Sequence, residues 1–159
     1  MGAGRKGLGD INYLAHARPQ QLYSVTPLDR AAWDWESLVW KIAGALRSPQ
    51  LDQVEAQALL ADLWPRYWHL GRPIYQHAPR LIADPDYPGC GLAHSAKHWI
   101  LVRADQCRLP VLLHEMGHLL VPGSGHGPVW IQIMLKLWEA ELHVPESVAL
   151  LDGQQLVTA

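Results

Sequence analysis

Five consecutive residues, His114-Glu115-Met116-Gly117-His118, have the types and the spacing that metal chemistry needs. In an α-helix, residues four apart project from one face about one turn apart, so His114 and His118 can share a metal ion. Glu115 lies next to the first of them, where its carboxylate can reach an attacking water without binding the metal. The pattern therefore predicts a zinc site that performs hydrolysis.

A third ligand is needed, because catalytic zinc usually takes three protein ligands and keeps one position for water. His126 is the nearest candidate. Pro122-Gly123 predicts the end of the helix and the following glycines a flexible turn, while Pro128 is favoured at the first position of the next helix. His126 then stands at the mouth of the turn, and we predict it as the third ligand.

Chance is the competing explanation for the motif. With 9 His and 6 Glu among 159 residues, the pattern is expected by chance roughly 0.02 times in the chain. The flanking residues, 109–113 and 119–121, are apolar and of helical character. This context predicts a buried helix that carries the motif rather than two unrelated histidines.

The segments HEMGH, VPGSG and HGPVW together resemble the SprT-like zinc metallopeptidases, and within them the small metallohydrolases of bacteria and phages. The resemblance is strong over residues 109–140. It is weaker upstream, where residues 91–102 resemble the strand that precedes the active-site helix of that family and residues 29–36 its opening helix.

This resemblance implies an α+β, zincin-like fold, a minimal metallopeptidase domain with helices packed on a small β-sheet and the motif on the central helix. It implies His114, His118 and His126 as zinc ligands and Glu115 as the catalytic base. Longer members of the family end in a four-cysteine zinc ribbon, which this chain lacks. The DNA-binding role of those members is therefore not implied, and nucleic acid stays open as a partner.

Two other groups of zinc peptidases share part of the motif. Metzincins place glycine and histidine where this chain has Val121 and Ser124, so that pattern fails. ImmA/IrrE-like regulatory metallopeptidases often read HE-x-G-H-L-L, as this chain does, and usually take an acidic third ligand from a later helix. Glu139 or Glu141 would be that ligand, but the HGP segment would then have no role.

The predicted function is zinc-dependent hydrolysis, with a protein or peptide as the substrate. Glu115 would take a proton as water attacks the carbonyl, and would pass it to the leaving nitrogen. A nonpeptide amide is an alternative substrate, and a non-catalytic zinc-binding interaction module on the same fold is an alternative function. The intact Glu115 argues against the module, because a structural zinc site gains little from that carboxylate.

Length and composition limit the other functional classes that the protein could belong to. The length fits one domain, and a net charge of −2 gives no general basic field for nucleic acid or an anionic membrane. Two cysteines are too few for a disulfide framework. The chain has no apolar run of membrane-spanning length and no signal-peptide pattern, so we expect a cytoplasmic protein without a membrane partner. Its oligomeric state is not predicted.

The sequence predicts two helices in the N-terminal half of the chain. Thr26, Pro27 and Asp29 form a helix-start signal, and a helix is predicted to about Arg47 with an apolar stripe of Trp35, Leu38, Val39, Ile42, Ala43 and Leu46. A second helix is predicted from Leu51 to Trp64, between a start signal at residues 48–49 and Pro65.

Prolines and glycines exclude a long helix between Arg72 and Arg108. Two short apolar runs there, 81–83 and 99–102, predict strands of a small sheet. The last helix is predicted from Pro128 to Leu142. The chain thus divides into a flexible N-terminal arm (1–24), a single metallopeptidase domain (25–145) and a C-terminal tail (146–159) with at most an apolar turn.

Three further residues concern the cleft. In zincins an edge strand lies along the active-site cleft, and by analogy a peptide here would be held by main-chain hydrogen bonds. His94 and His98 are four apart, which on one strand means about 13 Å, too far for one ion. We predict them as surface or cleft-edge residues, and name Tyr87, His94 and His98 as candidate oxyanion donors.

Overall fold

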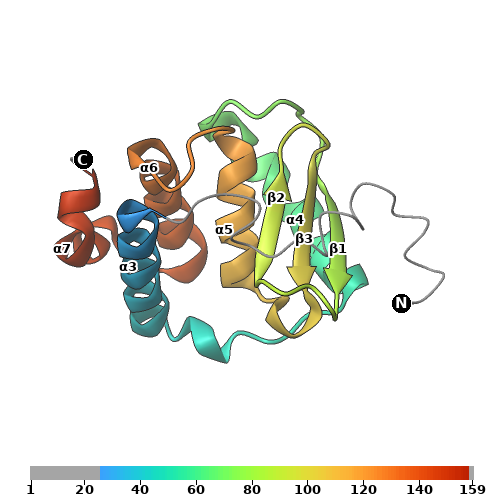
Figure 1. The fold of residues 1–159 in the computed structure, drawn as a ribbon, viewed down its shortest axis with the longest axis horizontal. Coiled ribbons are helices and arrows are strands. Elements are labelled where there is room, and N and C mark those ends of the chain that lie inside the picture. Colours follow the sequence, from blue (N-terminus) through green and yellow to red (C-terminus); the bar gives the residue numbers. More distant parts are fainter. Residues whose placement is uncertain (1–25, 158–159) are drawn as a thin grey trace.

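The computed structural model describes residues 26–157, so the predicted N-terminal arm (1–24) lies outside the described residues. The fold is a mixed α+β arrangement of helices and one small sheet (Figure 1). In chain order the elements are α3 (Pro27–Ala43), α4 (Gln53–Tyr67), β1 (Arg80–Asp84), β2 (Gly91–His94), β3 (Trp99–Arg103), α5 (Leu109–Leu120), α6 (Pro128–Leu137) and α7 (Glu146–Val157).

The sheet has three strands in the order β1-β3-β2. The central strand β3 pairs parallel with β1 and antiparallel with β2, and its residues 99–102 are all buried. The strands predicted at 81–83 and 99–102 are confirmed as β1 and β3, but the one strand that the resemblance implied over 91–102 is wrong. Residues 95–98 form a turn, with His98 in the left-handed region at φ 56°, so β2 and β3 form a hairpin. His94 and His98 therefore lie at the end of β2 and in the turn.

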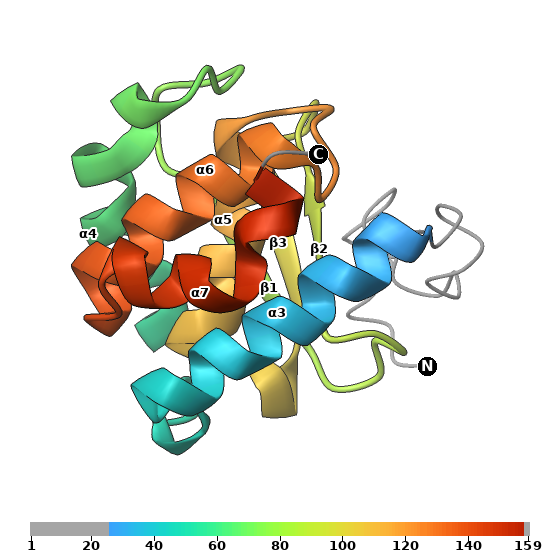
Figure 2. The same cartoon turned by 90° about the vertical axis from the view of Figure 1, so that its left-hand side faces the viewer.

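The helix α5 carries the histidine motif and lies at the centre of the fold. It packs against β2 and β3 on one side and against α6 on another. In Figures 1 and 2, α3, α6 and α7 cover the side of α5 that faces away from the sheet. A Cβ at Gly117 would lie 2.7 Å from the Met134 sulfur and 2.9 Å from Trp130 Nε1. The glycine of the motif therefore allows α5 and α6 to pack closely.

The start of α3 agrees with the sequence, and its end does not. Thr26 and Asp29 form a reciprocal capping box. The α-helix ends before Gly44, which adopts φ 66°, and a short 3₁₀ turn follows over Ala45–Arg47. The predicted stripe is also shifted. Leu38 and Ile42 are 46% and 52% exposed, and the buried face consists of Ala32, Trp35, Glu36 and Val39.

The predicted limits of α4 are also wrong. The helix begins after Asp52, whose carboxylate and the Glu55 side chain form a second capping box, and not at Leu51 after a start signal at residues 48–49. It continues through Pro65 to Tyr67. A proline removes one backbone N–H, and so close to the helix end this loss does not stop the last turn.

The C-terminal segment is more ordered than its sequence pattern indicates. Residues 146–157 form α7, which packs against α3 and α6. Trp35 Nε1 donates a hydrogen bond of 2.8 Å to the carbonyl of Ala149, which is 1% exposed. The predicted last helix does extend from Pro128 to Leu142, but its final part, Trp138–Leu142, is π-helical.

Tryptophan supplies much of the core. Five of the eight Trp residues are at most 2% exposed: Trp35, Trp64, Trp99, Trp130 and Trp138. These side chains supply aromatic core volume in a chain that has no Phe. Among residues 26–157, no helix has both the length and the apolar character required to cross a membrane.

The contrast between Trp35 and Leu38 on α3 is testable. We expect Trp35→Phe to lower the free energy of unfolding by about 1–3 kcal/mol, because it removes buried volume and a buried hydrogen bond. Leu38→Ala, on the exposed face, should change it by less than about 0.5 kcal/mol. Urea denaturation followed by circular dichroism measures both. Equal losses would contradict the described orientation of α3.

Candidate metal centre

Two of the three predicted ligands come from one face of α5, and the third returns to it through a glycine loop. His114 and His118 lie one turn apart on α5. Gly123 and Gly125 adopt φ values of 78° and 56°, a conformation that glycine adopts without strain. The chain thus reverses direction within a few residues and places His126 beside α5, just before α6 begins.

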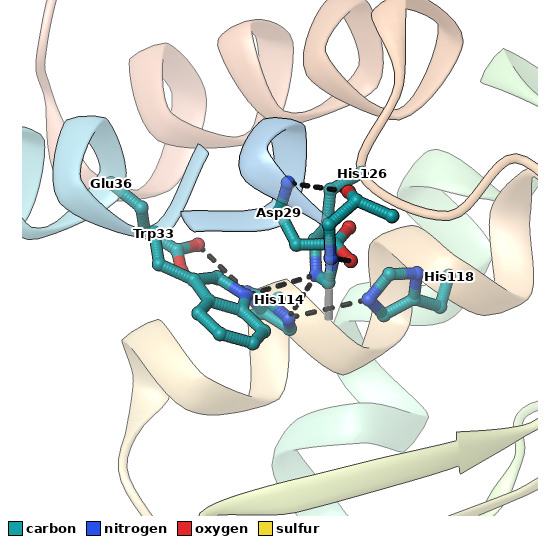
Figure 3. Close-up of polar contacts among 7 residues, drawn as sticks. Asp29, Trp33, Glu36, His114, His118 and His126 are labelled. Carbon is teal, nitrogen blue, oxygen red and sulfur yellow. Dashed lines mark hydrogen bonds and ion pairs between the residues drawn. The ribbon is translucent and has the colours of Figure 1, made fainter. Parts of the chain in front are cut away.

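The geometry of the three imidazoles fits one metal ion. His114 Nε2 lies 3.2 Å from His118 Nε2 and 3.2 Å from His126 Nε2, and the three donor atoms lie within 4.8 Å of one another. Tetrahedral coordination with bonds of about 2.0–2.1 Å places nitrogen ligands about 3.3–3.4 Å apart. Figure 3 shows the three rings pointing toward a common position. The structure therefore brings together all three histidines in a group that can hold a metal.

Two carboxylates of α3 orient two of these rings. His114 Nδ1 donates to Glu36, with both carboxylate oxygens at 2.8 and 3.0 Å. His126 Nδ1 donates to Asp29 Oδ1 at 3.0 Å. A histidine whose Nδ1–H is held by a carboxylate presents the lone pair of Nε2 to a metal and binds it more strongly. Both contacts are visible in Figure 3.

Sequence reasoning missed both of these carboxylates as parts of the site. Asp29 was recognised only as a helix-start residue, yet it has two roles: one oxygen accepts from Thr26 N at 2.9 Å and the other binds His126. Glu36 is 4% exposed, on the buried face of α3. The available signal was its spacing, four residues after Ala32 and three before Val39, where an apolar side chain would normally pack.

Two tryptophans complete the surroundings of the rings. Trp130, fully buried at the start of α6, contacts all three imidazoles, with centroid distances of 5.0 Å to His114, 5.5 Å to His118 and 4.9 Å to His126. The buried Trp130 indole therefore packs against the whole histidine cluster. Trp33 Nε1 donates a long hydrogen bond of 3.3 Å to His126 Nε2, the same lone pair that a metal would use.

The Glu115 carboxylate lies against Gly91 of β2. It is 5% exposed, and a Cβ at Gly91 would lie only 2.7 Å from Glu115 Oε2. The absence of a side chain at Gly91, the first residue of β2, thus provides the space for this carboxylate. The predicted base is therefore positioned by β2.

Two adjacent cavities meet at His114, Glu115 and Gly91. The first, about 350 Å³, has mostly apolar walls from α3, α5 and the segment before β2. The second, about 410 Å³, contains all three histidines and is also lined by Leu92 and Ala93 of β2. The edge strand β2 therefore runs along a cleft that contains the histidines and the glutamate.

In the metal-free protein, the charges of the cluster favour protonation of His114 over that of the other two histidines. Burial lowers the pKa of His114, but the charges of Glu36 and Glu115 outweigh it and raise the pKa to about 9. Burial and the charged His114 lower the pKa of His126 and bring that of His118 well below its usual value. Burial raises the pKa of Glu115 to about 7, with the charge of His114 opposing the shift. A metal must therefore displace the proton of His114.

The candidate oxyanion donors separate into two groups. His98 is buried and its Nε2 contacts the carbonyl of His77, while the His94 ring packs against Trp99. Neither histidine is among the residues that line the two cavities. Tyr87 does line the apolar cavity, and its hydroxyl donates to the Gly91 carbonyl at 3.5 Å. Of the three, Tyr87 is nearest to the cleft.

The acidic residues considered as an alternative third ligand lie elsewhere. Glu141 accepts a hydrogen bond from Tyr67 and forms an ion pair of 3.1 Å with Arg66. Glu139 is exposed. Neither belongs to the metal-binding group found among residues 26–157.

We expect Glu36→Gln to weaken metal binding by about 10–100-fold, because the charged partner of His114 Nδ1 is lost. Competition with a chromophoric chelator measures the affinity. Asp34→Asn, an exposed position two residues away on the same helix, is the matched control and should bind as the wild type does. An unchanged affinity in Glu36→Gln would show that this carboxylate does not support the ligand.

Metal affinity should also rise with pH. The metal-free protein holds a proton on His114 with a pKa of about 9, and metal binding requires the neutral imidazole. Between pH 7.5 and 8.5 we expect roughly a tenfold gain in affinity and the release of about one proton per metal bound. Titration calorimetry in two buffers with different ionisation enthalpies measures both. No proton release would contradict this charge distribution.

Comparisons with protein-family models, with curated proteins and with solved structures gave no match to this chain.

Proposed function

We propose that the protein is a zinc-dependent metallohydrolase, a peptidase of the zincin-like, SprT-like type, with His114, His118 and His126 as the zinc ligands. The observation that supports this most directly is the convergence of the three Nε2 atoms beside the buried Glu115 in an open cleft. Bound zinc supplies a Lewis acid and lowers the pKa of water toward neutrality.

The donor set favours zinc with an open position. Three neutral imidazoles in a tetrahedral arrangement are a known ligand set of catalytic zinc. The metal-binding group found within residues 26–157 has three members, His114, His118 and His126, which leaves room for water and substrate on the side of the cleft. A structural zinc site would usually have four protein ligands.

Glu115 has the properties of a proton carrier. Its carboxyl is buried, it lies at the junction of the two cavities, and its pKa of about 7 in the metal-free protein is close to neutral pH. A carboxyl group beside the position of an attacking water can take a proton from it and return the proton to the leaving group. It would accept the proton of the attacking water and donate it to the leaving nitrogen. A non-catalytic module would not need a buried acid here.

The cleft favours a peptide over a phosphorylated substrate. β2 is an edge strand of the sheet and lines the cleft beside the histidines, so an extended chain can pair with its main chain. The residues that line the two cavities include no Lys or Arg, which are the side chains that normally bind phosphate.

Cys90 and Cys107 are free thiols, which supports a reducing, cytoplasmic compartment.

The central test is Glu115→Gln. We expect this variant to keep about one zinc per chain and to lose hydrolysis by at least about 100-fold, because the amide cannot take the proton. Zinc is measured by elemental analysis, and activity by mass spectrometry of a defined peptide mixture.

Two control variants accompany this test. His126→Ala should lose zinc, and Glu139→Gln, at an exposed position on another helix, should retain both zinc and activity. Cleavage by Glu115→Gln at the wild-type rate would refute the proposed role of Glu115. Zinc retained in full by His126→Ala would refute the three-histidine site.

A further inference from the structure

We infer that the apolar cavity beside Glu115 is a side-chain pocket, and that it gives the protein a preference for peptides with a bulky, uncharged apolar residue next to the cleaved bond. This inference rests on the proposed peptidase function and adds a substrate class to it. The cavity has a volume of about 350 Å³, within the range of pockets that bind small ligands.

Three aromatic side chains and one aliphatic side chain form its walls. Trp33 and Trp40 come from α3, Tyr87 from the segment before β2, and Val111 from α5. Tyr87 and Val111 are only 2% and 6% exposed, so the surrounding core holds them in place. Such a surface gains free energy when an apolar side chain replaces water in it.

The position of the cavity links it to the reaction. It shares His114, Glu115 and Gly91 with the cavity that contains the histidine cluster. Side chains of an extended chain alternate between opposite sides, so a peptide alongside β2 can direct one side chain into this cavity. The residue selected would therefore be adjacent to the bond under attack.

The charges around the cavity discriminate against ionised side chains. The carboxylates that line it belong to Glu36 and Glu115, and no Lys or Arg lines it. An acidic substrate residue would lose its hydration beside these carboxylates and would find no Lys or Arg to pair with. A basic residue would have to pair with Glu36, which already holds His114 with both oxygens, or with Glu115, the proposed proton carrier. An uncharged apolar side chain meets neither obstacle.

The first test is the cleavage profile of a defined peptide mixture, read by mass spectrometry. Wild-type protein should favour Leu, Phe or Met over Ala, Lys and Glu at one position beside the cleaved bond by about 10-fold or more. Val111→Phe fills the cavity and should shift the preference to Ala, whereas Trp40→Ala enlarges it and should shift the preference to larger side chains. Cleavage without either shift would overturn the inference.

A second test does not depend on activity. Cys90 lines the cavity and is exposed, while Cys107 is fully buried, so a maleimide should label Cys90 selectively. N-acetyl-phenylalaninamide at millimolar concentration should slow this labelling at least twofold, the amides of N-acetyl-lysine and N-acetyl-glutamate should not, and Val111→Phe should abolish the protection.

The two tests separate the two proposals. If wild-type protein cleaves no peptide but the phenylalanine amide alone protects Cys90, the peptidase proposal fails and the apolar pocket stands. If no amide protects Cys90, or all three protect it equally, the inference of an apolar pocket fails even where peptides are cleaved.

Discussion

The site depends on the hydrogen bonds between the carboxylates of α3 and the Nδ1 atoms of His114 and His126. A carboxylate buried as deeply as Glu36, at 4% exposure, is costly unless a charged or strongly polar group pairs with it. The Nδ1–H of His114 meets that need for Glu36, and the Nδ1–H of His126 donates to Asp29 in the same way. Thus α3 is bound to α5 and to the loop after it by the same contacts that orient two imidazoles, and a change in the position of α3 would alter both.

The rest of the fold keeps α5 from shifting beneath these contacts. Gly117 lets Trp130 approach closely enough to pack against all three imidazoles, and β2 supports Glu115 through the bare backbone of Gly91. α7 in turn holds α3, through Trp35 and the carbonyl of Ala149. Each element that contacts the cluster is therefore itself fixed by a second element, which is how a preorganised site is built.

Local chemistry made the centre of the site predictable. The four-residue spacing of His114 and His118 and the glycine loop before His126 needed no tertiary information, and neither did the capping box of α3. Asp29 and Glu36 could not be found in this way, because 97 and 78 residues separate them from their histidines. The hairpin and α7 were also missed. Four-residue β2 is too short for periodicity to reveal, and α7 has a weak apolar pattern that only packing on α3 and α6 makes helical.

The balance of charge explains why three carboxyl groups gather around three imidazoles. Asp29, Glu36 and Glu115 contribute up to three negative charges, and in the metal-free protein the high pKa of His114 lets one proton offset one of them. The raised pKa of Glu115 reduces the remaining excess of negative charge, because it keeps part of this carboxyl protonated near neutral pH. A divalent cation at the three Nε2 atoms would replace the proton and bring a further positive charge, so Glu115 could ionise at lower cost. Without a metal, the negative charges of this arrangement are not fully balanced. Metal binding and the ionised, proton-accepting form of Glu115 therefore support each other.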